Sequence, residues 1–338
     1  MCFSATATSY SQSAKYLLES YYTGRSKPVK TFSIGVFYDE WQAFIKQMLS
    51  PTDKLVFFQL NKIRIQALDA ARAEDLLTAE KCIKNLRLRL LTNRLSAQGG
   101  LICQSLTKAT ESYIDYKYGN FAEARKKTYE ALATYQSIEE EYKYEIIFFR
   151  RLQLVCNLVR IEGKSKNYQR GIELACHLLN YLQGISDVIP IPGSWGQKHI
   201  THQSSTIISA TYALLVREIA ELLVSELQYE NELFAIVATE LKLPNNNGYY
   251  LHPIAYTWLI VKQAKINKDI PEFLKLAANS IKKGRADVPL LWYATVIDLV
   301  SVCDELKLPE FQLLKQEIIK DSVNWQDCSP KFLDVLKV

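Results

Sequence analysis

The sequence contains few residues that interrupt helices and none of the motifs that mark common enzymes. Only 12 glycines and 10 prolines occur among 338 residues, which disfavours a sheet-rich fold and favours long helices. A Gly-rich phosphate loop, a nucleophile elbow and paired aspartate-rich motifs are all missing, which argues against the familiar phosphate-binding and hydrolase devices. Neither an HExxH motif nor a CxxC pair occurs, and we expect no metal and no cofactor.

Long apolar runs and a strong charge of one sign are also missing. The chain has 41 basic and 36 acidic residues, a net charge of +5, which permits an acidic partner without indicating nucleic acid. The longest apolar stretch carries Arg217, Glu218 and Glu221, so it predicts a buried helix rather than a membrane span. The first residues lack the charged and hydrophobic regions of a signal peptide. We therefore expect a cytoplasmic protein that binds neither membranes nor nucleic acid.

The seven cysteines form no metal-binding or disulfide pattern. Their number is odd and several fall in apolar helical segments, which indicates buried, reduced thiols in a cytosolic protein. Cys2 allows one alternative, because removal of Met1 would leave a cysteine whose free amine could activate its own thiol. Such nucleophiles usually sit at the end of a buried strand, and nothing here predicts a sheet, so we interpret Cys2 as an ordinary thiol.

Helical patterns follow one another along most of the chain. The predicted helices include 4–22, 37–49, 54–72, 98–118, 141–163, 253–266 and 308–321. The SPTD sequence at 50–53 is a typical helix start, since Ser50 can cap, Pro51 suits the first turn and Asp53 complements the helix dipole. Short breaks place Leu76, Phe121, Tyr168 and Ile270 in one equivalent role, with spacings of 45, 47 and 102 residues. A period of about 40 to 50 residues is the signature of an α-solenoid.

These breaks predict an all-α fold, a superhelical array of about six antiparallel helical hairpins. Small residues lie three positions after three of the four helix starts: Ala79, Ala124 and Gly171. At that point a small side chain lets the second helix of a hairpin approach the first. In YGNFAEARKKTYEAL (118–132) the glycine and asparagine supply the turn, and the small residues then recur at helical spacing.

This stretch resembles the second helix of a tetratricopeptide repeat. The matching residues are Gly119, Asn120, Phe121, Ala124, Ala131 and Leu132. The unit at 163–184 matches at Asn167 and Tyr168, the unit at 74–91 keeps Ala79, and the unit at 268–283 keeps little beyond Ile270. The resemblance covers about 55–185, although the helices are longer than a 34-residue unit permits. It implies a concave groove, lined by the first helices of successive hairpins, that holds a peptide or a protein.

We divide the sequence into three segments by its helix breaks. Residues 1–50 are expected to form an N-terminal helical cap, 51–185 the tetratricopeptide-like repeats, and 186–338 divergent C-terminal hairpins. Two loops, 186–205 and 242–253, interrupt the last segment. Loops that interrupt a regular array often carry function, and they are also where such arrays tolerate insertions.

Polar stripes on the first helices are the main candidate binding residues. Arg150, Gln153, Asn157 and Arg160 recur at spacings of three, four and three on the predicted helix 141–163. Lys108 and Glu111 belong to a similar stripe on 98–118. An arginine can grip carboxylates while an amide clamps backbone, as extended peptides require. The alternative is the solvated face that any amphipathic helix has, and we interpret the basic residues of 81–94 in that way.

The loops supply a second candidate site. Its residues are Trp195, His199 and His202 in the first loop and His252 in the second. His199 and His202 form HxxH, which with a third ligand could hold zinc, but no suitably placed acidic residue follows, and a helix-start histidine pair is the simpler interpretation.

We therefore expect a non-catalytic scaffold that binds a protein or peptide in its groove. One alternative is an enzyme, or an enzyme's accessory subunit, with its site at the two loops. A further alternative is a peptide-responsive regulator in which ligand binding changes the superhelix pitch. The missing enzyme motifs favour a non-catalytic role and leave unusual chemistry open.

Overall fold

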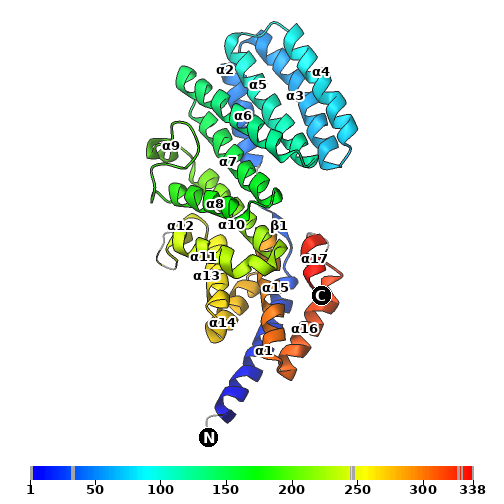
Figure 1. The fold of residues 1–338 in the computed structure, drawn as a ribbon, viewed down its shortest axis with the longest axis vertical. Helices are drawn as coiled ribbons and strands as arrows, with labels where there is room; N and C mark the ends of the chain where they lie inside the picture. The colour runs from blue at the N-terminus through cyan, green and yellow to red at the C-terminus, as the bar shows by residue number, and fades with distance from the viewer. Residues whose placement is uncertain are drawn as a thin grey trace. The chain divides into compact units, whose positions relative to one another are not determined.

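The computed structural model describes residues 3–31, 35–243, 245, 248–325, 328 and 330–336. These residues are almost entirely helical (Figure 1). The helices are α1 (Phe3–Arg25), α2 (Gly35–Met48), α3 (Pro51–Arg72), α4 (Leu76–Thr92), α5 (Ala97–Lys117), α6 (Phe121–Tyr142), α7 (Ile146–Lys164), α8 (Tyr168–Leu182), α9 (Gln197–Thr201), α10 (Ser205–Ser225), α11 (Glu230–Leu241), α12 (Gly248–Leu251), α13 (Pro253–Ile266), α14 (Ile270–Lys282), α15 (Pro289–Leu306), α16 (Pro309–Ser322) and α17 (Pro330–Leu336), with a 3₁₀ turn at Leu227–Tyr229. The all-α class expected from the sequence is confirmed.

The chain forms two compact units. Unit 1 combines residues 1–33 with 212–338, and unit 2 comprises residues 34–211. The chain thus enters unit 1, builds all of unit 2 and then returns to complete unit 1. Residues 1–33 consequently group with the C-terminal half rather than with 34–50. The three segments 1–50, 51–185 and 186–338 were drawn from helix breaks alone and remain a prediction.

One turn recurs at the four predicted helix starts. Helices α4, α6, α8 and α14 begin at Leu76, Phe121, Tyr168 and Ile270, as the sequence predicts. Each is preceded by a left-handed residue and then by an Asp or Asn at the N-cap: Glu74–Asp75, Gly119–Asn120, Lys166–Asn167 and Lys268–Asp269. In all four turns, the backbone N–H of the cap residue donates to the carbonyl five residues earlier. The backbone N–H of the left-handed residue donates to the carbonyl three residues earlier. This pair of bonds closes the preceding helix as a Schellman motif.

Small residues bring α5 and α6 into close contact. Ala124 and Ala131 are fully buried, and the Ser112 hydroxyl of α5 donates to the Ala124 carbonyl at 2.7 Å. The same hydroxyl lies 2.7 Å from the Thr128 hydroxyl. A larger residue at 124 or 128 would separate the two helices. The close approach that the YGNFAEARKKTYEAL stretch predicts is therefore present.

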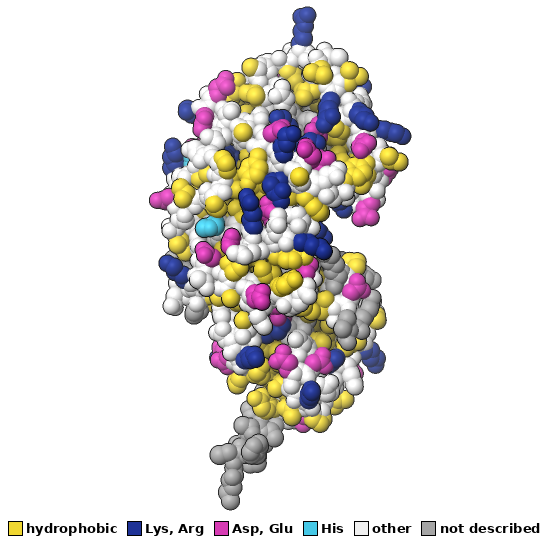
Figure 2. Space-filling model, viewed as in Figure 1, with side chains coloured by type: hydrophobic (Ala, Val, Ile, Leu, Met, Phe, Trp, Pro, Cys, Tyr) yellow, Lys and Arg dark blue, Asp and Glu magenta, His cyan; other side chains and the backbone are white. Residues whose placement is uncertain are grey.

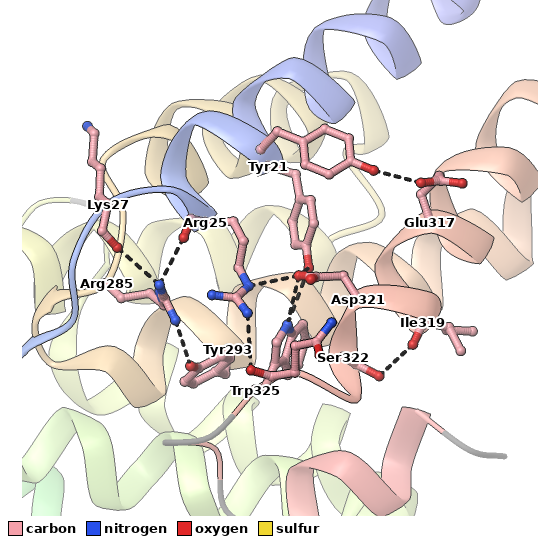
Figure 3. Close-up of polar contacts among 12 residues, drawn as sticks. Tyr21, Arg25, Lys27, Arg285, Tyr293, Glu317, Ile319, Asp321, Ser322 and Trp325 are labelled. Carbon is pink, nitrogen blue, oxygen red and sulfur yellow. Dashed lines mark hydrogen bonds and ion pairs between the residues drawn. The ribbon is translucent and has the colours of Figure 1, made fainter.

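Within unit 1, α1 is held by polar contacts to the C-terminal helices (Figure 3). The Asp321 carboxylate of α16 accepts from the Tyr21 hydroxyl at 2.6 Å and from Arg25 Nε at 2.8 Å. Arg285 donates to the carbonyl oxygens of Arg25 and Lys27, at 2.9 and 3.0 Å. Beside these bonds, β1 (Lys30–Thr31) pairs in parallel with β2 (Ala286–Asp287). Two segments about 260 residues apart in sequence are thus joined in one structure.

A buried group of four charged side chains joins α11, α13 and α15 of unit 1. Lys262 is fully buried and Asp298 is 1% exposed. Lys262 Nζ donates to Asp298 Oδ1 at 2.6 Å and also to Glu230. Lys265 Nζ bonds the same two carboxylates, each at 2.8 Å. Two positive and two negative charges balance, which is the condition under which charges are tolerated in a core.

Three predicted segments need correction. The predicted helix 141–163 is wrong at its start, because α6 continues to Tyr142, the left-handed Lys143 ends it, and α7 begins at Ile146. The loop 186–205 contains the short helix α9, and 242–253 contains α12. Cys2 and residues 244, 246 and 247 of the second loop lie outside the described residues. Among the helices of the described ranges, none is both long enough and apolar enough to cross a bilayer.

Candidate binding surface

The polar stripe predicted on helix 141–163 is present along one face of α7. Arg150, Gln153, Asn157 and Arg160 are all half-buried. Most of the buried residues of α7 are apolar, among them Leu154, Leu158 and Ile161. Arg150 Nη1 donates to Gln153 Oε1 at 2.9 Å, and Arg160 Nη1 donates to Asn157 Oδ1 at 3.1 Å. The stripe therefore consists of two arginine–amide pairs in which each amide oxygen orients a guanidinium.

Arg150 also contacts α2. Its guanidinium carbon lies 4.4 Å from the centre of the Trp41 ring of α2, within the range of a cation–π interaction. Trp41 is 2% exposed, and its neighbour Phe44 packs edge-on against Tyr144 at 4.9 Å between ring centres. Burial lowers the pKa of the Arg150 guanidinium from its ordinary value. The Trp41 ring thus lies against the Arg150 guanidinium at the N-terminal end of the α7 stripe.

The α5 residues of the predicted site contact the neighbouring helices α4 and α6. Lys108 Nζ donates to Glu130 of α6 at 2.9 Å. Glu111 accepts from Arg87 Nε of α4 at 2.5 Å and lies 3.8 Å from Lys127 Nζ of α6. The α5 and α7 residues thus have different partners. The expectation of a single continuous groove remains a prediction.

An open pocket of about 380 Å³ surrounds Glu111 between α4, α5 and α6. Its lining includes Lys84 and Arg87 on one side, Asp115 and Lys127 on another, and the ring of Tyr118. Lys127 Nζ donates to Asp115 at 2.5 Å. Figure 2 shows basic, acidic and apolar side chains intermixed on the drawn face of this part of unit 2. Charges of both signs at the pocket give it no preference for a strongly charged ligand.

The first loop folds over a buried arginine. Arg151, 1% exposed, donates to Glu139 at 2.7 Å and to the Ser194 carbonyl at 2.8 Å. The Trp195 ring covers the guanidinium, with its centre 4.0 Å away. His199 stacks on Phe148 at 5.0 Å between ring centres. The structure therefore brings the predicted Trp195 and His199 into one cluster.

The two loop histidines pair with different glutamates. His199 Nδ1 lies 2.8 Å from Glu139 Oε1, and His202 Nδ1 lies 2.9 Å from Glu145 Oε1. Burial lowers the pKa of His199, and the Glu139 charge opposes this without reversing it. A neutral His199 donates through Nδ1, which leaves Nε2 as an acceptor. Among the described residues, this buried Nε2 has no hydrogen-bond partner. His202 is more than half exposed.

His252 belongs to unit 1 and acts as a helix cap. It is 4% exposed, and its Nδ1 accepts from the Ala255 N–H at 3.2 Å at the start of α13. Burial lowers the pKa of this imidazole as well. A neutral ring is required here because a protonated Nδ1 could not accept the bond. His252 thus has a structural role that accounts for its burial.

The sequence analysis did not select three residues of these clusters. Trp41 and Glu139 have no sequence signal, because their contacts join distant segments. The burial of Arg151 had a signal, since Phe148 and Val155, three residues before it and four after it, lie on the same buried face of α7. Within the described ranges, no three histidine, cysteine, aspartate or glutamate side chains are grouped so that they could hold a metal ion.

Comparisons with protein-family models, with curated proteins and with solved structures find no match to this chain. Function is therefore inferred from the side chains themselves.

Proposed function

We propose that this protein is a non-catalytic scaffold that binds a protein or peptide segment through the polar face of α7. The observation that supports the proposal most is the pair of arginine–amide contacts, Arg150–Gln153 and Arg160–Asn157. Side chains that are already oriented lose less conformational entropy when they bind. A half-buried guanidinium also forms stronger bonds to a carboxylate than a fully solvated one.

The recurring turn supports the larger architecture of the proposal. Four pairs of contacting helices are joined by a turn in which a left-handed residue precedes an Asp or Asn cap. We propose that they form a divergent α-solenoid, similar to tetratricopeptide repeats, in which first helices present polar side chains to partners. Four of the six described cysteines are buried, which fits a cytoplasmic location.

The chemistry of the α7 face defines the kind of partner. Two guanidinium groups about ten residues apart along a helix are separated by roughly 15 Å, from the helical rise of 1.5 Å per residue. An extended segment spans that distance in about five residues. We propose a segment with two acidic side chains at such a spacing, whose backbone the amides of Gln153 and Asn157 can contact between them.

Capture of a partner from the native host's lysate tests the proposal. The wild type is compared with an Asn157→Ala/Arg160→Ala variant, and bound proteins are read by mass spectrometry. The matched control is Gln169→Ala/Arg170→Ala, which changes exposed side chains of α8. We expect a partner that the wild type and control retain and the α7 variant loses. Equal capture by all three proteins would contradict the proposal.

Arg150 is a poorer choice for this test than its position suggests. Replacing it by alanine removes the cation–π contact with Trp41 and is expected to loosen α2, so a loss of capture would have two explanations. The Asn157→Ala/Arg160→Ala variant leaves the contact between Arg150 and Trp41 in place. A thermal melt of each variant checks that folding is unchanged.

A second candidate function is small-molecule chemistry at the first loop. The Glu139–His199 pair favours it, because a carboxylate that orients a neutral imidazole leaves Nε2 as a base. The competing interpretation is that Trp195 and His199 simply pack on Arg151 and Phe148. A screen of metabolites by thermal shift separates the two. A compound that raises the melting temperature of the wild type and not of His199→Gln would support chemistry at this loop. If no compound does so, the packing interpretation is supported.

A further inference from the structure

The outer face of α4 carries an exposed stripe with the spacing of a helix-pairing seam. Leu77, Lys81, Lys84, Leu88 and Leu91 follow one another at intervals of four, three, four and three residues. This is the spacing of the two apolar positions in a heptad repeat. We call these five residues the α4 stripe. The three leucines are 71%, 62% and 85% exposed, which is unusual for side chains of this kind at such a spacing.

The opposite face of α4 explains why the stripe is exposed. Ala79, Ile83 and Leu86 are buried, and α4 packs against α3 and α5 on that side. In Figure 1, α4 lies at the edge of unit 2, with α3 and α5 on its inner side. A helix at the end of a stacked array normally has a polar outer face. The leucines of the α4 stripe depart from that rule.

We propose that the α4 stripe is a docking surface for an acidic amphipathic helix. The partner would place leucines or similar residues against Leu77, Leu88 and Leu91. It would place glutamate or aspartate opposite Lys81 and Lys84, where the middle of the stripe is basic. Lys84 lies 4.0 Å from Glu80 in an exposed pair, a contact weak enough for a partner's carboxylate to replace.

Charge decides between this partner and two others. In a dimer of this chain, two α4 helices would pair through their stripes. In a parallel pair, the lysines of one stripe would face the lysines of the other, and in an antiparallel pair Lys84 would face Lys84. Like charges would therefore meet in either orientation. A membrane would bury Lys81 and Lys84 together with the leucines, because all five residues share one face. An acidic helix satisfies both the leucines and the lysines. The proposal is independent of the α7 face.

A pair of synthetic peptides tests the assignment. The acidic probe is a 21-residue labelled helix with leucines at heptad spacing and glutamates at the two positions that face Lys81 and Lys84. The basic probe has lysines at those two positions. Fluorescence anisotropy measures the binding of each probe to the full chain and to Lys81→Glu/Lys84→Glu. The matched control, Lys126→Glu/Lys275→Glu, makes the same change of charge at exposed lysines elsewhere.

We expect the wild type and the control to bind the acidic probe and the charge-reversed variant to bind it at least about tenfold more weakly. The charge-reversed variant should instead bind the basic probe. Loss of the acidic probe's binding in Leu88→Gln would confirm the apolar contribution. No binding of the acidic probe, or equal binding by all variants, would overturn the proposal.

Two further measurements assign the surface to another occupant if the proposal is wrong. Binding of the wild type to phosphatidylserine vesicles that Leu88→Gln abolishes, without binding of the acidic probe, would identify a membrane surface. A concentration-dependent dimer in sedimentation velocity that Leu88→Gln dissociates would identify a second copy. Because the stripe is exposed, all of these variants should keep the wild-type circular dichroism spectrum and melting temperature.

Discussion

Replacing Lys262 by methionine should destabilise unit 1 strongly. The ammonium group is fully buried between Glu230 and Asp298. Methionine has a similar volume, so the change removes one positive charge and leaves little cavity. Lys265 then remains alone with two carboxylates, and one buried negative charge is uncompensated. Breaking a buried pair in this way costs about 3–5 kcal/mol.

The control for this variant is Lys275→Met in the same unit. The Lys275 side chain is 68% exposed and pairs with Glu272 at 3.0 Å. Exposed pairs contribute about 0–1 kcal/mol, so this variant should unfold nearly as the wild type does. Both changes are lysine to methionine, which cancels the general effect of one lost positive charge and an added thioether.

Peptide-resolved hydrogen exchange under mild denaturant is the assay, because the chain has two units and a single melting curve would mix them. We expect α11, α13 and α15 to lose protection in Lys262→Met, with α5 and α6 unchanged. A second variant, Lys262→Met/Asp298→Leu, removes one charge of each sign and should lose less than the sum of the single changes. A cost for Lys262→Met as small as that for Lys275→Met would refute the reasoning.

Three further predictions follow from single positions. Gly24→Ala would place a methyl group onto the Ile281 carbonyl oxygen, so we expect about 1–3 kcal/mol of destabilisation and faster exchange in α1. Gly119→Val forces a β-branched residue to φ +78 and should cost about 1–2 kcal/mol, measured as lost protection in α5 and α6. Because burial lowers the pKa of His199, its neutral form stabilises the loop above pH about 6.5 and that stability falls as pH drops through the lowered pKa. An NMR titration in which His199 titrates at or above the ordinary value would contradict this, with His199→Gln used for assignment.

The helix starts were predictable because their signals are local. Leu76, Phe121, Tyr168 and Ile270 each follow an Asp or Asn cap, and such caps favour a helix start whatever packs around them. The break at Lys143 was missed because it lacks this signal. No Asp or Asn directly follows the left-handed Lys143, and Glu145, the N-cap residue of α7, makes no side-chain cap bond.

The packing partners of the candidate site could not be predicted in the same way. The four polar residues of α7 were found from their spacing, which reports which residues share a face. Spacing does not show that Trp41 lies over Arg150 or that Trp195 covers Arg151. These contacts join segments that are far apart in sequence. The grouping of α1 with the C-terminal helices has the same origin, since the bonds of Asp321 to Tyr21 and Arg25 join opposite ends of the chain.

Site-specific photo-crosslinking at position 153 tests the proposed binding face most directly. A photoreactive amino acid replaces Gln153, at the centre of the α7 stripe, or Gln169 on the exposed surface of α8 as the control. Crosslinking in the native host's lysate is followed by mass spectrometry of the joined peptides. We predict a partner joined at position 153 and absent at 169, through a segment that contains two acidic residues. The same set of products at both positions would contradict a binding role for the α7 face.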